Sequence, residues 1–92
     1  MPELTVKSFA KYKDLFGADK KIDVPLGGTI TDALILFAGQ VPKAQTELFE
    51  NGRLKSSVVL MYNNERIDFE DADTITLEDG DELVLYPPVS GG

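Results

Sequence analysis

The sequence predicts a single α+β domain in which a mixed sheet of four to five strands carries one main helix on one face. Short segments near both ends of the chain have apolar residues at every second position, which is typical of strands. One longer segment has apolar residues at helical spacing. A chain of 92 residues has room for one hydrophobic core. Since one helix covers only one face of a sheet, we expect the other face to be open.

The first half of the chain supplies two strands and a short helical segment. Residues 4–9 (LTVKSF) alternate in polarity as a strand does. Residues 10–17 (AKYKDLFG) follow as a short helical stretch, which Gly17 is placed to end. Residues 21–26 (KIDVPL) form the second strand, where Pro25 indicates an edge strand or a strand end.

The main helix is the clearest element of the sequence. Thr29 and Asp32 have the spacing of a capping box, in which two side chains satisfy free amides at a helix start. The residues that follow at helical spacing form the predicted buried face: Ile30, Ala33, Leu34, Phe37 and Val41.

The second half of the chain is less regular. Residues 42–56 are ambiguous, and Leu48 and Phe49 could lie on a short second helix that ends at Asn51 and Gly52. Three strands complete the sheet, at residues 57–62, 65–69 and 82–86, with a turn at Asn63 and Asn64 and an acidic loop before the last strand. This order of elements is the β-grasp arrangement.

The composition excludes several classes of function. The chain has no cysteine and no histidine. Disulfides, thiolate nucleophiles, zinc–cysteine sites and iron–sulfur clusters are therefore excluded, and the commonest general base is missing. We expect no metal site, no cofactor and no catalytic side chain.

The net charge of the chain restricts the classes of partner that we expect it to bind. Sixteen acidic and nine basic residues give a net charge of −7. Nucleic-acid binding requires positive charge, so we do not expect it. We expect instead a protein partner with a basic docking face.

No apolar run is long enough to cross a membrane. We therefore expect a cytoplasmic protein with no membrane partner.

Three sequence features resemble one known family. They are Phe9-Ala10 after the first strand, GGT before the main helix, and DGDELVLYPPVSGG over residues 79–92. Together with the order of elements they resemble the ubiquitin-like sulfur carriers, above all the MoaD type, the small subunit of molybdopterin synthase. The archaeal ubiquitin-like modifiers share the same tail and fold.

The resemblance implies a carrier and not an enzyme. In that family an ATP-dependent activating enzyme would adenylate the carboxylate of Gly92, and a sulfur donor would then replace AMP to leave a thiocarboxylate. The large subunit of molybdopterin synthase would accept the sulfur during formation of the molybdenum cofactor. The resemblance also allows two alternatives, a modifier conjugated through Gly92 to target-protein lysines and a sulfur carrier for thiamine or tRNA thiolation. A plain binding module with an incidental tail is a further possibility.

The predicted division of the chain is a β-grasp domain at residues 1–86 and a flexible tail at residues 87–92. Pro87 and Pro88 would stiffen the base of the tail, because proline fixes φ and favours extended geometry. Val89 and Ser90 would enter the partner with them. The terminal pair Gly91-Gly92 has no side chains to obstruct a narrow channel.

A docking surface is predicted from strand alternation. In a β-grasp sheet the first and last strands lie side by side. Phe9, Val84 and Tyr86 would then form an exposed apolar cluster on the face that the helix leaves open.

Overall fold

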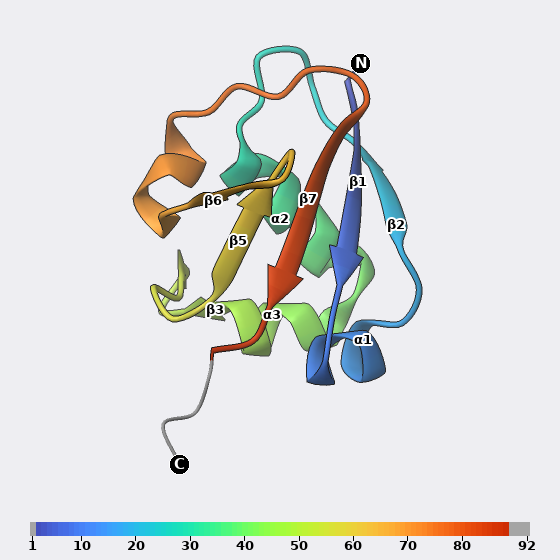
Figure 1. Cartoon of the computed structure of the whole chain (residues 1–92), viewed down its shortest axis with the longest axis vertical. Coiled ribbons are helices and arrows are strands. Elements are labelled where there is room, and N and C mark those ends of the chain that lie inside the picture. Colours follow the sequence, from blue (N-terminus) through green and yellow to red (C-terminus); the bar gives the residue numbers. More distant parts are fainter. Residues whose placement is uncertain (1, 89–92) are drawn as a thin grey trace.

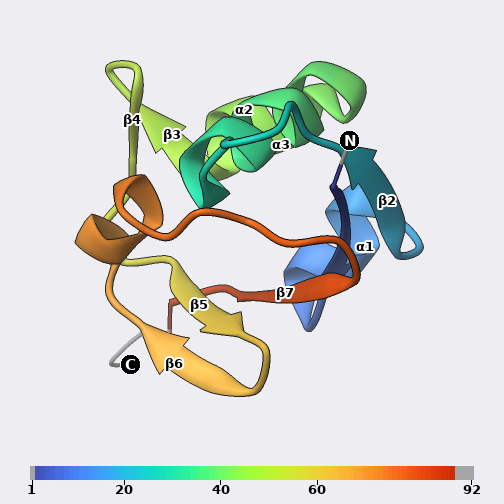
Figure 2. The ribbon, with the colours of Figure 1, turned by 90° about the horizontal axis from the view of Figure 1, so that it is seen from above.

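A computed structural model of the chain describes residues 2–88, which fold into a sheet with helices on one face (Figure 1, Figure 2). The sheet consists, in this order, of β2 (Lys20–Asp23), β1 (Glu3–Ser8), β7 (Asp81–Tyr86), β5 (Val59–Tyr62) and β6 (Glu65–Ile67). The helices are α1 (Lys11–Phe16), α2 (Ile30–Gln40) and α3 (Pro42–Leu48). The predicted mixed sheet of four to five strands is thus confirmed, with five strands. Pro25 follows the end of β2, which is an edge strand, as the sequence indicates.

The first and last strands are the parallel pair at the centre of the sheet. Their register runs from Leu4 opposite Asp81 to Ser8 opposite Leu85, and the other strand pairs are antiparallel. Because β1 and β7 run in the same direction, they end at the same end of the sheet, the lower end in Figure 1. This confirms the predicted adjacency and brings residues that follow each strand close together.

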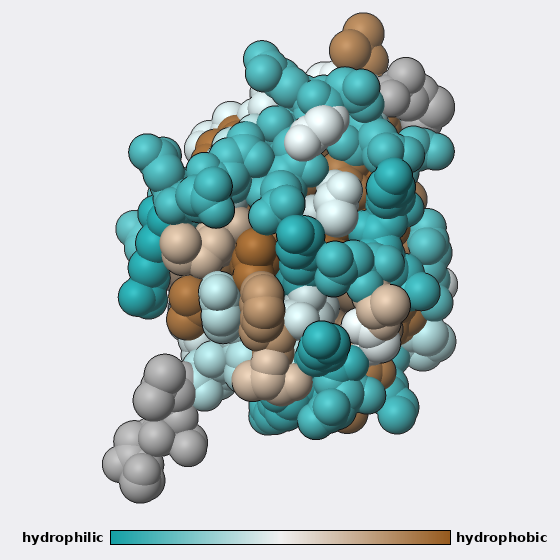
Figure 3. All heavy atoms as spheres, turned by 45° about the vertical axis from the view of Figure 1, so that its right-hand side comes forward, coloured by the Kyte–Doolittle hydropathy of each residue, from teal (hydrophilic) through white to brown (hydrophobic). Residues whose placement is uncertain are grey.

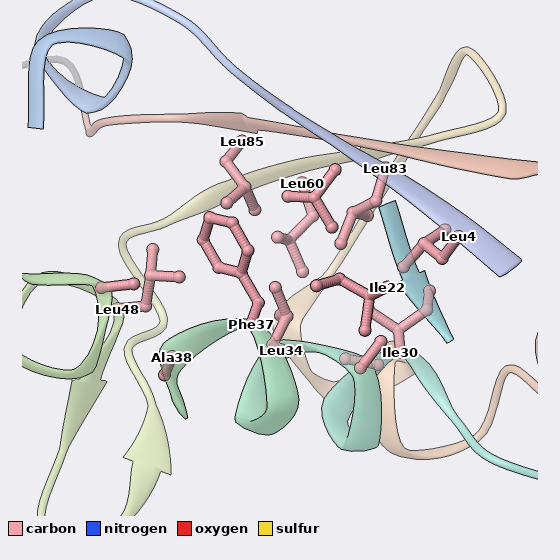
Figure 4. Packing of buried hydrophobic residues seen from close by; sticks show 14 of the residues in the cluster. Leu4, Ile22, Ile30, Leu34, Phe37, Ala38, Leu48, Leu60, Leu83 and Leu85 are labelled. Atoms are coloured by element: carbon pink, nitrogen blue, oxygen red, sulfur yellow. The ribbon is translucent and has the colours of Figure 1, made fainter. Parts of the chain in front are cut away.

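Helix α2 begins as the sequence predicts, and its buried face packs against the sheet to form part of the core. The amide of Asp32 donates to Thr29 Oγ1 over 3.3 Å, and the amide of Thr29 donates to Asp32 Oδ2 over 2.9 Å. All five residues of the predicted apolar stripe are buried. Figure 4 shows the side chains of α2 meeting those of the strands: Leu34 and Phe37 face Leu60, Leu83 and Leu85.

The ambiguous segment contains a hairpin as well as a helix. Helix α3 ends at Leu48, and the two short strands β3 (Phe49–Glu50) and β4 (Arg53–Leu54) follow. The predicted helix end at Asn51 and Gly52 was wrong, because these residues form the hairpin turn. Their φ angles are 53° and 78°, and positive φ at both central residues is what a two-residue hairpin turn of type I′ requires.

The two strands of the β5–β6 hairpin are shorter than predicted, whereas β7 begins one residue earlier than predicted, at Asp81. A turn closed by the amide of Val58 and the carbonyl of Lys55 (3.3 Å) delays the start of β5 to Val59. At the other end of the hairpin, the expected strand at residues 65–69 stops at Ile67, and the 3₁₀ helix η1 (Phe69–Asp73) occupies part of the acidic loop. The predicted turn between β5 and β6 is confirmed by the positive φ angles of Asn63 and Asn64, 47° and 71°.

None of the helices within residues 2–88 is long and apolar enough to cross a membrane.

Candidate functional site

The face of the sheet opposite the helices carries an apolar surface. On β7, Leu83 and Leu85 belong to the core, whereas Val84 and Tyr86 alternate onto the other face. The strand register places Met61 on β5 beside Val84, and Val59 beside Tyr86. Figure 3 shows brown and tan side chains gathered toward the lower left of its view, with teal side chains around them. We call the apolar set on this face (Phe9, Val59, Met61, Val84 and Tyr86) the open-face cluster.

Phe9 and Tyr86 form the exposed part of this cluster. Their rings are stacked, with centroids 5.1 Å apart and planes 10° from parallel. Phe9 is 43% exposed and Tyr86 is 38% exposed. The amide of Phe9 donates to the carbonyl of Leu85 over 3.1 Å, which extends the β1–β7 pairing by one residue. The structure therefore brings together two of the three residues predicted for the docking surface.

Val84 differs from its prediction. It lies on the predicted face but is only 9% exposed, so it is not part of an exposed surface. The physical reason is its position at the middle of the central strand, where Lys7 of β1 and Met61 of β5 lie directly beside it. Alternation along one strand predicted the face correctly, but the sizes of the cross-strand neighbours decide the exposure.

Charged side chains border the open-face cluster. Lys7 Nζ lies 3.3 Å from Glu82 Oε2, and Lys21 Nζ lies 3.9 Å from Glu3 Oε1. Arg66 of β6 pairs in register with Met61 and so adds a positive charge on the other side. An apolar centre with a charged rim is the usual composition of a protein-binding surface.

The predicted tail begins directly after the stacked pair. Pro87 and Pro88 follow Tyr86, the last residue of β7. Pro88 is exposed, and Pro87 is partly exposed. The other predicted tail residues, Val89, Ser90, Gly91 and Gly92, lie outside the described residues. The exposed aromatic pair is therefore at the base of the predicted tail.

A polar cluster at the start of β7 was missed by sequence reasoning. The carboxylate of Asp81 accepts hydrogen bonds from the Tyr62 hydroxyl, from Asn63 Nδ2 (3.1 Å) and from the amide of Glu78 (2.8 Å). Burial alone would raise the pKa of Asp81, but these hydrogen bonds outweigh it and hold the pKa below its usual value. Burial and the bond to Asp81 raise the pKa of Tyr62 to about 12. The acidic DGDE turn was the available signal, but it does not show which carboxylate is buried.

The remaining surface offers a shallow groove between the β3–β4 hairpin and η1. Its apolar lining consists of Phe49, Leu54 and Phe69, and charged residues line it as well: Arg53, Glu70 and Asp73. The groove shares no residue with the open-face cluster. Among residues 2–88, no group of three or more Asp and Glu side chains is arranged to hold a metal ion.

The fold and its open face define a ubiquitin-like β-grasp protein. The sequence matches the ThiS family over residues 6–92, and the chain belongs to this family.

Two relatives and one solved structure illustrate the similarity. The chain is 33% identical to small archaeal modifier protein 1 of Haloferax volcanii, over 94% of this chain and 97% of that protein. It is also 33% identical to the molybdopterin synthase sulfur carrier subunit of Drosophila erecta, over 91% of this chain and 84% of that protein. The crystal structure of SAMP1 from Haloferax volcanii superposes with a TM-score of 0.86 at 32% identity and covers 98% of this chain and 99% of that one.

Proposed function

We propose that the chain is a sulfur carrier whose Gly92 carboxylate is adenylated and then converted to a thiocarboxylate. It would donate this sulfur in molybdopterin biosynthesis as the small subunit of molybdopterin synthase. The main support is the match to the ThiS family, which extends to residue 92, together with the similarity to a molybdopterin synthase sulfur carrier subunit.

The proposed chemistry places the reaction on the backbone and not on a side chain. The carboxylate oxygen of Gly92 attacks the α-phosphorus of ATP in the activating enzyme and releases pyrophosphate. Hydrosulfide, a sulfur donor that is already at the sulfide level, then attacks the acyl carbon of the adenylate, the bond from that carbon to the AMP oxygen breaks, and AMP leaves. The products are a thiocarboxylate on Gly92 and free AMP. In this proposal the chain acts as a protein-sized cosubstrate and contributes no catalytic side chain.

The open-face cluster is the proposed docking surface for both partners, the activating enzyme and the large subunit. An exposed aromatic pair surrounded by charges fits such a role. The six residues 87–92 would reach about 20 Å from the sheet when extended, so that Gly92 enters the partner's active site while the domain at residues 1–86 stays outside. ATP-dependent activation of this kind would take place in the cytoplasm.

The decisive experiment measures adenylation of Gly92. The purified chain is incubated with its activating enzyme and ATP, and the acyl-adenylate is measured by intact mass. We expect Gly92→Ala to lower the rate by at least about tenfold, which corresponds to about 1.4 kcal/mol in the barrier. Gly39→Ala is the matched control, because a methyl group at Gly39 would meet no atom within 4 Å apart from its chain neighbours and the backbone of its own helix. Equal rates in the two variants would refute the proposal.

A modifier function is the second candidate, and the similarity to small archaeal modifier protein 1 favours it. The same activated Gly92 would then form an isopeptide bond with a target-protein lysine. The two functions differ in the covalent state of Gly92 in cells. Replacement of one oxygen by sulfur supports the carrier, and Gly-Gly remnants on lysines of other proteins support the modifier. Sulfur transfer to thiamine or tRNA precursors instead of the pterin would show as a different acceptor for the same thiocarboxylate.

A further inference from the structure

The chain turns sharply between β1 and α1 at a residue that is not suited to the turn. Ala10 has φ 54° and ψ −136°, and the amide of Tyr12 donates to the carbonyl of Phe9 over 3.2 Å. This is the geometry of a type II′ turn with Ala10 at its first central position, where glycine is strongly preferred. A residue other than glycine that is held at positive φ is strained, and the surrounding structure has to offset this strain.

Both flanks of Ala10 are fixed by interactions of their own. On one side, the amide of Phe9 is bonded to the carbonyl of Leu85. On the other side, Tyr12 and Phe16 of α1 are buried and stack on each other with centroids 5.0 Å apart. Ala10 itself is exposed, so its methyl group contributes no packing that would explain the conformation. The turn is therefore imposed from both sides.

This imposed turn determines where the ring of Phe9 lies. The ring covers Tyr86, the last residue of β7, and the two rings are stacked 5.1 Å apart. On its other side Tyr86 pairs with Val59 of β5. The next residue, Pro87, has no amide to donate and cannot extend the ladder. The stack and the pairing with Val59 thus hold Tyr86, the last residue of the strand.

We propose that Phe9 is a positioning residue: the turn at Ala10 holds its ring against Tyr86 and so fixes the direction in which Pro87 and Pro88 leave the sheet. This role is separate from docking, because it acts within the isolated chain. It rests on the proposed function for its biological purpose, which is to present Gly92 to the activating enzyme in one direction.

The first test uses the isolated chain and needs no partner. In NMR spectra we expect Phe9→Ala to lower the heteronuclear NOE of the Tyr86 amide and to speed hydrogen exchange of the residue 9 amide by roughly tenfold. Phe9→Tyr, which keeps a ring, should restore both values. Met61→Ala is the matched control, since it removes an apolar side chain from the same face, and Met61 pairs in register with Val84 and not with Tyr86. Unchanged dynamics at Tyr86 in Phe9→Ala would overturn the proposal.

A second variant separates positioning from stability. We expect Ala10→Gly to keep or raise the melting temperature, because glycine relieves the strain, and at the same time to lower the order of Tyr86, because glycine holds Phe9 less firmly. A variant that merely damaged the fold would lower both. A melting temperature clearly below that of the parent chain, or an unchanged heteronuclear NOE of the Tyr86 amide, would contradict the positioning role of Phe9.

The third test uses the activating enzyme and distinguishes the two roles of the surface. A residue that only docks changes KM, whereas misdirection of the tail lowers kcat, and a small displacement of a reacting group costs as much as about a hundredfold. We expect Phe9→Ala to lower kcat for adenylation by about tenfold and Met61→Ala to raise only KM. An effect of Phe9→Ala on KM alone would make Phe9 a docking residue. If the parent chain is not adenylated at all, the proposed function fails, while the NMR comparison still decides the positioning role.

Discussion

The carboxylate of Asp81 illustrates how much one side chain contributes at the start of a strand. It joins the Tyr62 hydroxyl and Asn63 Nδ2 from the β5–β6 hairpin to the amide of Glu78 in the preceding loop. Asp81 is 7% exposed, and hydrogen bonds to a buried charge contribute more than those between neutral groups. The single carboxylate therefore fixes the hairpin and the loop to β7.

We predict that Asp81→Asn destabilises the protein by about 2 kcal/mol at pH 7, because an amide cannot accept from all three donors and leaves at least one unsatisfied. The folded-state pKa of Asp81 is lowered, so its contribution is present above the unfolded-state pKa and is lost as the pH falls through the folded-state value. Urea unfolding at pH 7 and at pH 2 to 3 measures both effects, and the difference between the variant and the parent should shrink in acid.

The matched control for this prediction is Asp19→Asn, because Asp19 is exposed. We expect the control to stay within about 0.5 kcal/mol of the parent chain at both pH values. A loss of equal size in the two variants would mean that general charge, and not the hydrogen bonds to Asp81, accounts for the effect.

The stability of the protein is also expected to fall in alkali. The raised pKa of Tyr62, about 12, predicts a loss of stability as the pH rises from about 10 toward that value.

At the scale of secondary structure, the start of α2 and most of its buried face could be predicted, and the segment after it could not. Periodicity and the pairing of Thr29 with Asp32 are local signals, and they specify the start and the buried face of α2. In residues 42–56 the local signals conflict, because Asn51-Gly52 suits both a helix end and a hairpin turn. The choice depends on the pairing of Phe49 with Leu54, which is a tertiary contact that no local pattern contains.

Two glycines at the two ends of α2 are predicted to respond in opposite directions to alanine. At Gly28 a methyl group would lie 2.3 Å from Val24 Cγ1 and 3.0 Å from the carbonyl oxygen of Pro25, so we expect Gly28→Ala to cost about 1 to 3 kcal/mol. At Gly39 there is open space, so Gly39→Ala should add about 0.5 to 1 kcal/mol by helix propensity. Thermal or urea unfolding measures both, and a Gly28→Ala variant as stable as the parent would contradict the close packing described here.

At the scale of the whole molecule, the candidate site results from two layers that leave one face of the sheet free. The adjacency of the first and last strands could be predicted from the element order, and strand alternation placed Phe9 and Tyr86 on the open face. The stacking of these rings and the burial of Val84 could not be predicted. The burial of Val84 depends on the register between strands, which brings Lys7 and Met61 beside it. The stacking of the two rings depends on the turn at Ala10.

Partner binding is predicted to distinguish the two faces of the molecule. Met61 lies in the open-face cluster, whereas Leu36 is 41% exposed on α2, which lies on the other side of the sheet, in the upper part of Figure 2. A new carboxylate in a docking surface loses its hydration without gaining a partner. We therefore expect Met61→Asp to weaken binding to the proposed partner, the large subunit of molybdopterin synthase, by at least about tenfold, or about 1.4 kcal/mol, and Leu36→Asp to leave it unchanged. Calorimetric titration with both folded variants measures the difference. Loss of binding only in Leu36→Asp would move the docking surface to the helical layer and leave the open-face cluster without its proposed role.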